Sequence, residues 1–252
     1  MLQVRVIPSL LLKDNKLVKS IKFKKHKYIG DPINAIKIFN DKEVDELVFL
    51  DISASKSGKG PNFKLLNEIA SECFMPLAYG GGINSLNHIE KILKLGFEKI
   101  ILNYAAAVNP TLINEASKEF GSSTLVVSID VKKNLFNKNR VFVLNGSKST
   151  NKDPIDYAKE MQERGAGEIL LNSVERDGTM EGYDLDLIGK MTNVLQIPLV
   201  ACGGAGKLDD FKLAISSGAS AVSAGSVFVF KGPNRAVLIN YPSIKDLENL
   251  FR

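Results

Sequence analysis

Short apolar runs alternate with helix-like segments along the whole chain. Each run is almost wholly apolar and is followed by a polar turn, a pattern typical of strands buried on both faces of a parallel sheet. The runs predict strands at residues 4–10, 46–52, 76–79, 99–103, 125–130, 168–173, 198–202 and 221–225. Segments such as PINAIKIFND and LNHIEKILKLG lie between them and repeat apolar residues at helical spacing.

This alternation predicts the fold class. Eight strand–helix units in 252 residues fit a closed (β/α)8 barrel. An open, doubly wound sheet shows the same alternation and stays as the alternative. No linker or low-complexity tract interrupts the pattern, so we expect a single domain over residues 1–252.

The second half of the chain repeats features of the first. PLAYGGGI resembles PLVACGGAGK, DELVFLDISAS resembles AGEILLNSVERDG, and LGFEKIILN resembles SGASAVSAG. The matched positions are 81 and 203, 47 and 169, and 96 and 218, so each pair is 122 residues apart. One offset shared by three segments predicts a barrel built from two duplicated halves.

Charge and histidine content narrow the range of ligands. The net charge of +5 is modest and no platform of basic and aromatic residues recurs, which argues against nucleic-acid binding. The densest basic cluster, SIKFKKHKY at residues 20–28, is expected to be a solvated loop, with anion binding as the alternative. His26 and His88 lie far apart without ligand spacing, so we expect no metal and no cofactor.

The expected location is the cytoplasm. No apolar run approaches the roughly 20 residues that cross a bilayer, so we expect no membrane partner. The N-terminus, MLQVRVIPSL, lacks the separate charged, apolar and cleavage regions of a signal peptide. Cys73 and Cys202 offer no disulfide framework, which suits a reducing compartment.

Two glycine-rich turns are candidates for phosphate binding. GGGIN follows the third predicted strand and GGAGK follows the seventh, at duplicate positions. Glycines let backbone N–H groups approach an anion closely, and the start of the next helix adds positive potential. Asn103 and the pair Gly225–Ser226 each follow one strand later, and ERDGT at 175–179 adds further turn amides. The pattern predicts a site for two phosphates or a phosphosugar.

Two carboxylates end predicted strands on the same side of the barrel. Asp51 closes the second strand and Asp130 closes the fifth, where a barrel places its chemistry. Either can act as a general acid or base once its surroundings adjust its pKa. For Asp51, capping of the following loop or helix is an equal alternative. Asp130 continues into VKK without a helix start, which favours a catalytic role.

At these residues the chain resembles the cyclase subunit of imidazole glycerol phosphate synthase. The resemblance runs through RVIPSL, GDPI, DELVFLDI, GGGI, FGS, SID, RGAGEILL, RDGT…GYD and GGAGK, over nearly the whole length. It implies a barrel that takes ammonia from a glutaminase subunit docked at its lower face. At its upper face such a barrel converts a bis-phosphorylated ribonucleotide into imidazole glycerol phosphate and an aminoimidazole ribonucleotide.

The resemblance also implies roles for particular residues. It assigns one phosphate to Gly82, Asn103 and Gly178, and the other to Gly204, Gly225 and Ser226. Lys19, in the long loop after the first strand, matches a mobile lid lysine that takes part in catalysis. Asp130 matches the second of two catalytic acids, and Asp51 and Asp177 are expected to support the site.

A further set of four charged residues matches the ring through which ammonia enters these barrels. They are Arg5, Glu46, Lys99 and Glu168, each at the start of a strand, with basic and acidic residues alternating. Four buried charges are costly unless they pair with one another. The alternative is a structural plug of salt bridges, and in either case the lower face is expected to bind a partner.

The first catalytic acid of the family is missing. Its position is occupied by Leu11, which can neither donate nor accept a proton. Asp14 lies three residues onward, in the expected loop, and rescue by Asp14 is the alternative. Tyr104 and Asn172 are further departures on the same face.

This combination resembles a paralogous branch found with bacterial surface-polysaccharide genes. In that branch a glutaminase and the barrel are thought to serve a separate sugar amidotransferase, which turns a sugar N-acetyl group into an acetamidino group. A genuine cyclase of histidine biosynthesis that tolerates Leu11 is the alternative, as is a non-catalytic scaffold or ammonia conduit. The last segment, KGPNRAVLINYPSIKDLENLFR, departs most from the family and predicts only a final helix.

Overall fold

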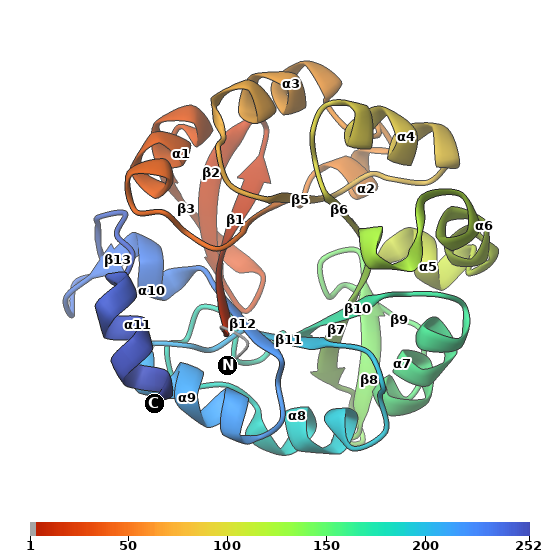
Figure 1. Ribbon diagram of the computed structural model, residues 1–252. Coiled ribbons are helices and arrows are strands. Elements are labelled where there is room, and N and C mark those ends of the chain that lie inside the picture. The colour runs from red at the N-terminus through yellow and green to blue at the C-terminus, as the bar shows by residue number, and fades with distance from the viewer. Residues whose placement is uncertain (1–3) are drawn as a thin grey trace.

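The computed structural model describes residues 4–252, which form a closed barrel of 8 parallel strands with helices around it (Figure 1). Its strands are β1 (Arg5–Lys13), β4 (Leu47–Asp51), β5 (Leu77–Gly80), β6 (Lys99–Leu102), β7 (Leu125–Lys133), β10 (Glu168–Ser173), β11 (Leu199–Cys202) and β12 (Ala221–Ala224). The barrel closes because β1 pairs with both β4 and β12, and β7 with both β6 and β10. The (β/α)8 prediction is therefore confirmed, and the open sheet is excluded.

The helices form an outer layer around the strands (Figure 1). The longer ones are α1 (Pro32–Asp41), α3 (Phe63–Glu72), α4 (Leu86–Lys94), α6 (Thr111–Phe120), α7 (Pro154–Glu163), α8 (Leu185–Thr192), α9 (Leu208–Ser216) and α11 (Ile244–Phe251). Local sequence sets their starts: Asp31 accepts hydrogen bonds from the N–H groups of Ile33 and Asn34, with Pro32 in the first turn. The final helix expected near the C-terminus is α11.

The barrel interior is a separate core from the one under the helices. The inner cluster comprises Ile7, Val48, Ala78, Ile101, Val126, Leu170, Val200, Cys202 and Ala221. Along β1, side chains at every second residue point inward, so Arg5, Ile7, Ser9 and Leu11 rise through the barrel in that order. The interior is therefore charged where the strands begin, apolar in the middle and mostly polar where they end. We call these the lower and upper ends.

Two β-hairpins lie at the upper end and were not predicted. The first consists of β2 (Lys16–Ile21) and β3 (Lys24–Gly30), and the second of β8 (Asn139–Val143) and β9 (Lys148–Ser149). The basic segment at residues 20–28, expected to be a solvated loop, is thus largely β-structure. Lys19 lies in β2 with its side chain buried, and the loop placement was wrong because β1 continues to Lys13 and pairs with β2.

The remaining elements are short. They are α2 (Ala54–Ser57), α5 (Tyr104–Val108), η1 (Ser122–Thr124), α10 (Ser226–Val229), β13 (Phe230–Lys231) and β14 (Ala236–Val237). Over residues 4–252, no helix is both long and apolar enough to cross a membrane.

Candidate functional site

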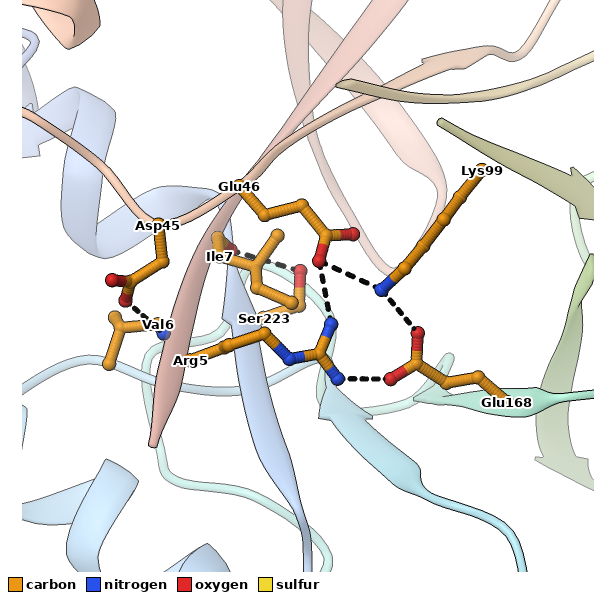
Figure 2. A network of polar contacts seen from close by, with 8 residues as sticks. All are labelled: Arg5, Val6, Ile7, Asp45, Glu46, Lys99, Glu168 and Ser223. Atoms are coloured by element: carbon orange, nitrogen blue, oxygen red, sulfur yellow. Dashed lines mark hydrogen bonds and ion pairs between the residues drawn. The ribbon is translucent and has the colours of Figure 1, made fainter. Parts of the chain in front are cut away.

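Four charged side chains meet at the lower end of the barrel interior (Figure 2). Arg5 Nη1 donates to Glu46 Oε2 over 2.6 Å, and Arg5 Nη2 donates to Glu168 Oε1. Lys99 Nζ lies 2.9 Å from Glu46 Oε2 and 2.8 Å from Glu168 Oε2. Each cation bridges both carboxylates, so the four residues form a closed ring whose formal charges cancel. We call this set the charged ring.

The ring is buried on its acidic side and partly open on its basic side. The side chains of Glu46 and Glu168 are 6% and 7% exposed, whereas those of Arg5 and Lys99 are 31% and 21% exposed. Burial alone would lower the pKa of Arg5, but the hydrogen bonds and charges of Glu168 and Glu46 raise it above its ordinary value. The mutual pairing offsets the desolvation that isolated charges would suffer here.

Three carboxylates lie at the upper end, and two of them are already engaged. Asp51 Oδ1 accepts hydrogen bonds from Ser53 N at 2.8 Å, Ser53 Oγ at 2.7 Å and Ala54 N at 3.0 Å. Asp51 therefore holds the turn that leads into α2, which is the capping alternative. Asp177 accepts from Lys19 Nζ at 2.8 Å and pairs with it as a buried salt bridge.

The third carboxylate, Asp130, has amide neighbours instead of a cation. Asn103 Nδ2 lies 3.3 Å from Asp130 Oδ2, and Asn172 also donates a hydrogen bond to the carboxylate. Burial and then the nearby charge of Asp177 raise the pKa of Asp130 to about 7, against the opposing effect of the Asn172 hydrogen bond. A carboxyl group that titrates near neutrality can give or take a proton under physiological conditions.

Leu11 faces this acid across the mouth of the barrel. Its side chain is buried and lines two neighbouring upper cavities. Asp14, three residues further on, is exposed in the β1–β2 turn with a φ of 50° and lines neither cavity. The structure therefore gives no support to rescue by Asp14. Asp51 borders the first cavity, but its Oδ1 is held by the α2 turn.

The first cavity contains one of the two predicted phosphate turns. It measures about 100 Å³ and is bordered by Gly82, Asn103, Tyr104 and Asp130, among others. Gly82 has a φ of 68°, and a Cβ there would lie 2.8 Å from Ala54 Cβ and from the backbone of Gly60. Only glycine fits this turn without displacing neighbours, and the Gly82 N–H donates to Ser55 Oγ over 3.1 Å.

The second cavity contains the other turn. It measures about 30 Å³ and is bordered by Lys19, Asp177, Gly178, Gly204, Gly225 and Ser226. The structure corrects one grouping: Gly178, expected beside Gly82 and Asn103, lies here, because the loop after β10 bends toward β11 and β12. The hydroxyl of Ser226 is buried and has no hydrogen-bond partner among residues 4–252.

The β2–β3 hairpin covers the second cavity. Lys22 N donates to the Asp177 carbonyl over 2.8 Å, and Ser20 Oγ donates to Asp177 Oδ2 over 3.2 Å. Arg235, from the C-terminal segment, donates to the carbonyls of Gly178 and Thr179 and so braces the loop beneath the hairpin. Phe23, at the hairpin turn, borders both cavities.

Several residues that border the site were not predicted from the sequence. Ser20, Phe23 and His26 come from the hairpin and Asn145 comes from the β8–β9 turn, whereas Asn172, at the end of β10, was noted from the sequence as a departure on this face. Burial and the nearby Lys13, Lys56 and Lys19 lower the pKa of His26. The alternation of polar and apolar residues in KLVKSI was the available signal for β2.

The described part of the chain contains no group of three His, Cys, Asp or Glu side chains placed to hold a metal ion. Its upper cavities instead combine glycine turns, one buried lysine and one titratable acid. The backbone N–H groups of the turns and the lysine ammonium together suit a phosphorylated small molecule.

Comparison with known proteins identifies relatives over almost the full length. A family model described as "Histidine biosynthesis protein" matches residues 5–233. A Leptospira interrogans protein named "Putative imidazole glycerol phosphate synthase subunit HisF" is 51% identical over 100% of both chains. The Pseudomonas aeruginosa protein named "Putative imidazole glycerol phosphate synthase subunit hisF2" is 49% identical over 98% of this chain and 99% of its own. The Campylobacter concisus "Imidazole glycerol phosphate synthase subunit HisF" is 44% identical over 90% and 89%.

Proposed function

We propose a function from one premise: the chain belongs to the histidine biosynthesis protein family and is a cyclase-type subunit related to HisF. We infer that it receives ammonia from a glutaminase partner at the lower end of the barrel. It supplies that ammonia for amidination of a nucleotide-sugar N-acetyl group in O-antigen or surface-polysaccharide synthesis. A separate sugar amidotransferase carries out the amidination, and both proteins work in the cytoplasm.

The observation that carries this proposal is the contrast between the two ends of one barrel. The charged ring at the lower end is complete, with both cations bridging both carboxylates. At the upper end Leu11 stands where the resemblance requires the first catalytic acid. Retention of the entrance together with loss of one acid supports a barrel that still takes in ammonia but serves a different acceptor.

The lower end suits a partner that delivers a small neutral molecule. Arg5 and Lys99 remain partly exposed, so a docking protein can reach the cationic side of the ring. Above the ring, the inner cluster from Ile7 to Ala221 is apolar apart from the Cys202 thiol. An apolar interior does not stabilise ammonium, and it therefore favours passage of uncharged ammonia.

The upper end suits a phosphorylated acceptor without two-acid catalysis. The two glycine turns border the two upper cavities, and Lys19 places a buried ammonium in the second cavity. Among the three carboxyl groups that border the upper cavities, Asp130 alone has neither a cationic partner nor a capping role. One titratable acid can serve proton transfer, but it cannot replace a matched acid and base.

A genuine histidine-pathway cyclase is the second candidate. It is favoured by the retained Asp130, whose pKa of about 7 suits acid–base work, and by the two phosphate turns. The two candidates differ in whether the barrel by itself turns over the bis-phosphorylated ribonucleotide.

The deciding experiment supplies that ribonucleotide and ammonium chloride to the purified barrel and follows release of the aminoimidazole ribonucleotide. We expect no turnover above background, together with activation of a cognate glutaminase on mixing. Robust turnover with free ammonium would eliminate the surface-polysaccharide proposal in favour of the cyclase.

The variant Leu11→Asp tests whether the missing acid is the reason for the expected absence of cyclase turnover. We expect it to raise turnover about 100-fold above background, because a positioned acid or base contributes roughly that factor or more. Leu11→Asn is the matched control, since it has a similar size and polarity but no titratable group. Equal rates for the two variants would show that Leu11 does not account for the lost activity.

The variant Asp130→Asn separates a catalytic barrel from a conduit. It is expected to remove any cyclase turnover while leaving glutaminase docking unchanged, because Asp130 lies at the opposite end of the barrel from the charged ring. Loss of glutaminase binding in this variant would contradict the assignment of docking to the lower face.

A further inference from the structure

The turn between β7 and β8 exposes two large apolar side chains. β7 and β8 pair as antiparallel strands, and Leu135 and Phe136, in the turn between them, are 101% and 82% exposed. We call these two residues the apolar tip. Hydrogen bonds fix the shape of the turn: Asn134 Oδ1 accepts from the N–H groups of Phe136 and Lys138, each over 3.0 Å. Apolar side chains held on an ordered turn gain free energy when another surface covers them, so the tip is suited to anchor a partner.

The apolar tip stands above the mouth of the barrel. β7 carries Asp130 at the mouth and continues to Lys133 before the turn begins. At about 3.3 Å per residue, the strand carries the tip roughly 10 Å beyond Asp130. At the other end of β8, Asn145 Nδ2 donates to the Ile52 carbonyl over 2.8 Å, which ties this hairpin to the loop after β4. The tip therefore projects from a braced support.

Lysines surround the mouth on the same side. The loops and hairpins after β1, β4 and β7, at residues 13–30, 52–62 and 131–150, carry many half-buried or exposed lysines and a single acidic residue, Asp14. None of these lysines forms an ion pair with another residue of 4–252. We call this set the basic arc, and its members are Lys13, Lys16, Lys22, Lys24, Lys25, Lys27, Lys56, Lys59, Lys132, Lys133, Lys138 and Lys148.

The charges of the separate loops act together over the first cavity. His26, in β3, borders that cavity, and burial, followed by the charges of Lys13, Lys56 and Lys19, lowers its pKa. Lys13 and Lys56 belong to different loops, so their potentials overlap at the mouth. A surface with this excess of one charge attracts a partner surface of the opposite charge.

We propose that the apolar tip and the basic arc form a docking surface for a protein that presents acidic residues around an apolar pocket. This inference rests on the proposed function, and it assigns the separate sugar amidotransferase to this surface. Ammonia that escapes into neutral water takes up a proton and is no longer a nucleophile. An acceptor enzyme seated over the mouth excludes that water and keeps the nitrogen reactive.

The position and charge of the surface favour such a protein over other occupants. A small anion can bind the basic arc, but it does not cover the apolar tip, since neither Leu135 nor Phe136 borders an upper cavity. A symmetric second copy of this chain would bring two basic arcs together, which their like charges oppose. A membrane seated on the tip would leave no acceptor over the mouth.

The test measures binding of the purified barrel to the purified sugar amidotransferase of the same organism by biolayer interferometry. The variant Phe136→Ser removes one anchor without disturbing the core, because the side chain is mostly exposed. We expect at least about tenfold weaker binding, the loss typical of one aromatic anchor. Phe74→Ser is the matched control: Phe74 precedes β5 at the lower end, is 87% exposed, and should bind the amidotransferase like the unmodified protein.

The double variant Lys24→Glu/Lys25→Glu tests the basic arc. We expect about tenfold slower association at about 50 mM potassium chloride, and a smaller difference at about 500 mM, because salt screens exposed charges. Lys159→Glu/Lys212→Glu reverses the same number of exposed charges on α7 and α9 and is the matched control. It should associate like the unmodified protein.

Three results would overturn the inference. The first is the absence of amidotransferase binding, or binding that Phe136→Ser and the Lys24/Lys25 variant leave unchanged. The second is sedimentation of the barrel with phosphatidylglycerol vesicles that Phe136→Ser abolishes, which would assign the tip to a membrane. The third is a dimer of the barrel that Phe136→Ser dissociates. Binding through this surface without ammonia transfer to a sugar would instead contradict the proposed function and leave the docking surface intact.

Discussion

The two ends of this barrel treat buried charge in opposite ways. At the lower end, the charged ring satisfies its two carboxylates with two cations, and the set is neutral (Figure 2). At the upper end, Asp130 has no cation within its described surroundings, and Asn172 and Ser226 each keep a buried oxygen without a partner. The lower end is thus complete within the chain, whereas the upper end keeps buried polar groups that the described residues leave without a partner.

The paired charges of the ring stabilise the fold, whereas the unpaired carboxylate of Asp130 destabilises it. Removal of one member of the ring leaves an unpaired buried charge, which is strongly unfavourable. Removal of the charge on Asp130 relieves a desolvated, repelled carboxylate. Substitutions at the two ends should therefore change stability with opposite signs.

The largest effect is expected for Glu168→Gln in the charged ring. This change leaves Arg5 and Lys99 with Glu46 as their one remaining anion, and we expect the free energy of unfolding to fall by about 3 kcal/mol. Urea unfolding at pH 8 measures the change. Glu90→Gln is the matched control, because Glu90 forms an exposed pair with Lys94 on α4 and should change stability by at most about 0.5 kcal/mol. Equal effects in the two variants would show that the charged ring contributes no more to stability than an exposed ion pair does.

Asp130→Asn should act in the opposite direction. The pKa of Asp130 is raised to about 7 from 3.8, so its ionisation disfavours the folded state. In the unmodified protein, protonated Asp130 makes its full contribution to the stability of the folded state below about pH 4. That contribution is lost as the pH rises to 7 and is absent at higher pH. The full pKa difference corresponds to about 4 kcal/mol at pH 8. Because the amide of Asp130→Asn is still a buried polar group, we expect about half of that, so that the variant is about 2 kcal/mol more stable than the unmodified protein at pH 8.

The pH dependence provides the internal control for Asp130→Asn. At pH 4 the carboxyl group is protonated in the folded state, so the stability difference should be close to zero there. Urea unfolding of both proteins across pH 4 to 8 measures it. A variant that is less stable than the unmodified protein at pH 8 would show that the upper carboxylate, like the lower ones, is held by favourable contacts.

The smallest of the three effects concerns the hairpin over the second cavity. A Cβ on Gly178 would lie 2.1 Å from the Ser20 carbonyl oxygen, so Gly178→Ala should displace the β2–β3 hairpin. Gly232→Ala is a close control, because its φ of 72° matches the 73° of Gly178 while no atom lies within 4 Å. We expect Gly178→Ala to destabilise hairpin closure by about 1 kcal/mol beyond the control.

Limited proteolysis at Lys22, Lys24 and Lys25 with trypsin measures that displacement, since these lysines lie in the turn and start of β3. The expected result is about fivefold faster cleavage in Gly178→Ala than in Gly232→Ala, which corresponds to about 1 kcal/mol. Equal cleavage rates would mean that the hairpin does not rest on the Gly178 turn.

Much of the fold and part of the site could be predicted from the sequence because they depend on local patterns. Apolar runs and helical spacing located all eight barrel strands, and the predicted helix PINAIKIFND has the bounds of α1. The resemblance to the family, together with charged residues at four strand starts, predicted the ring of Arg5, Glu46, Lys99 and Glu168. Gly178 was grouped with Gly82 and Asn103 but borders the second cavity, because the spacing of residues in the sequence does not reveal the direction in which a loop turns.

The sequence alone determined the alternation of strands and helices that makes the barrel, the four charged residues at its strand starts and the leucine at position 11, because each is a matter of residue type at a strand position. Tertiary structure decided which carboxylates are paired. Asp51, Asp130 and Asp177 are the same residue type near strand ends, yet one caps a turn, one binds Lys19 and one titrates near pH 7. Their differences arise from neighbours that lie far away in the chain, through burial and hydrogen bonding that only the closed barrel creates.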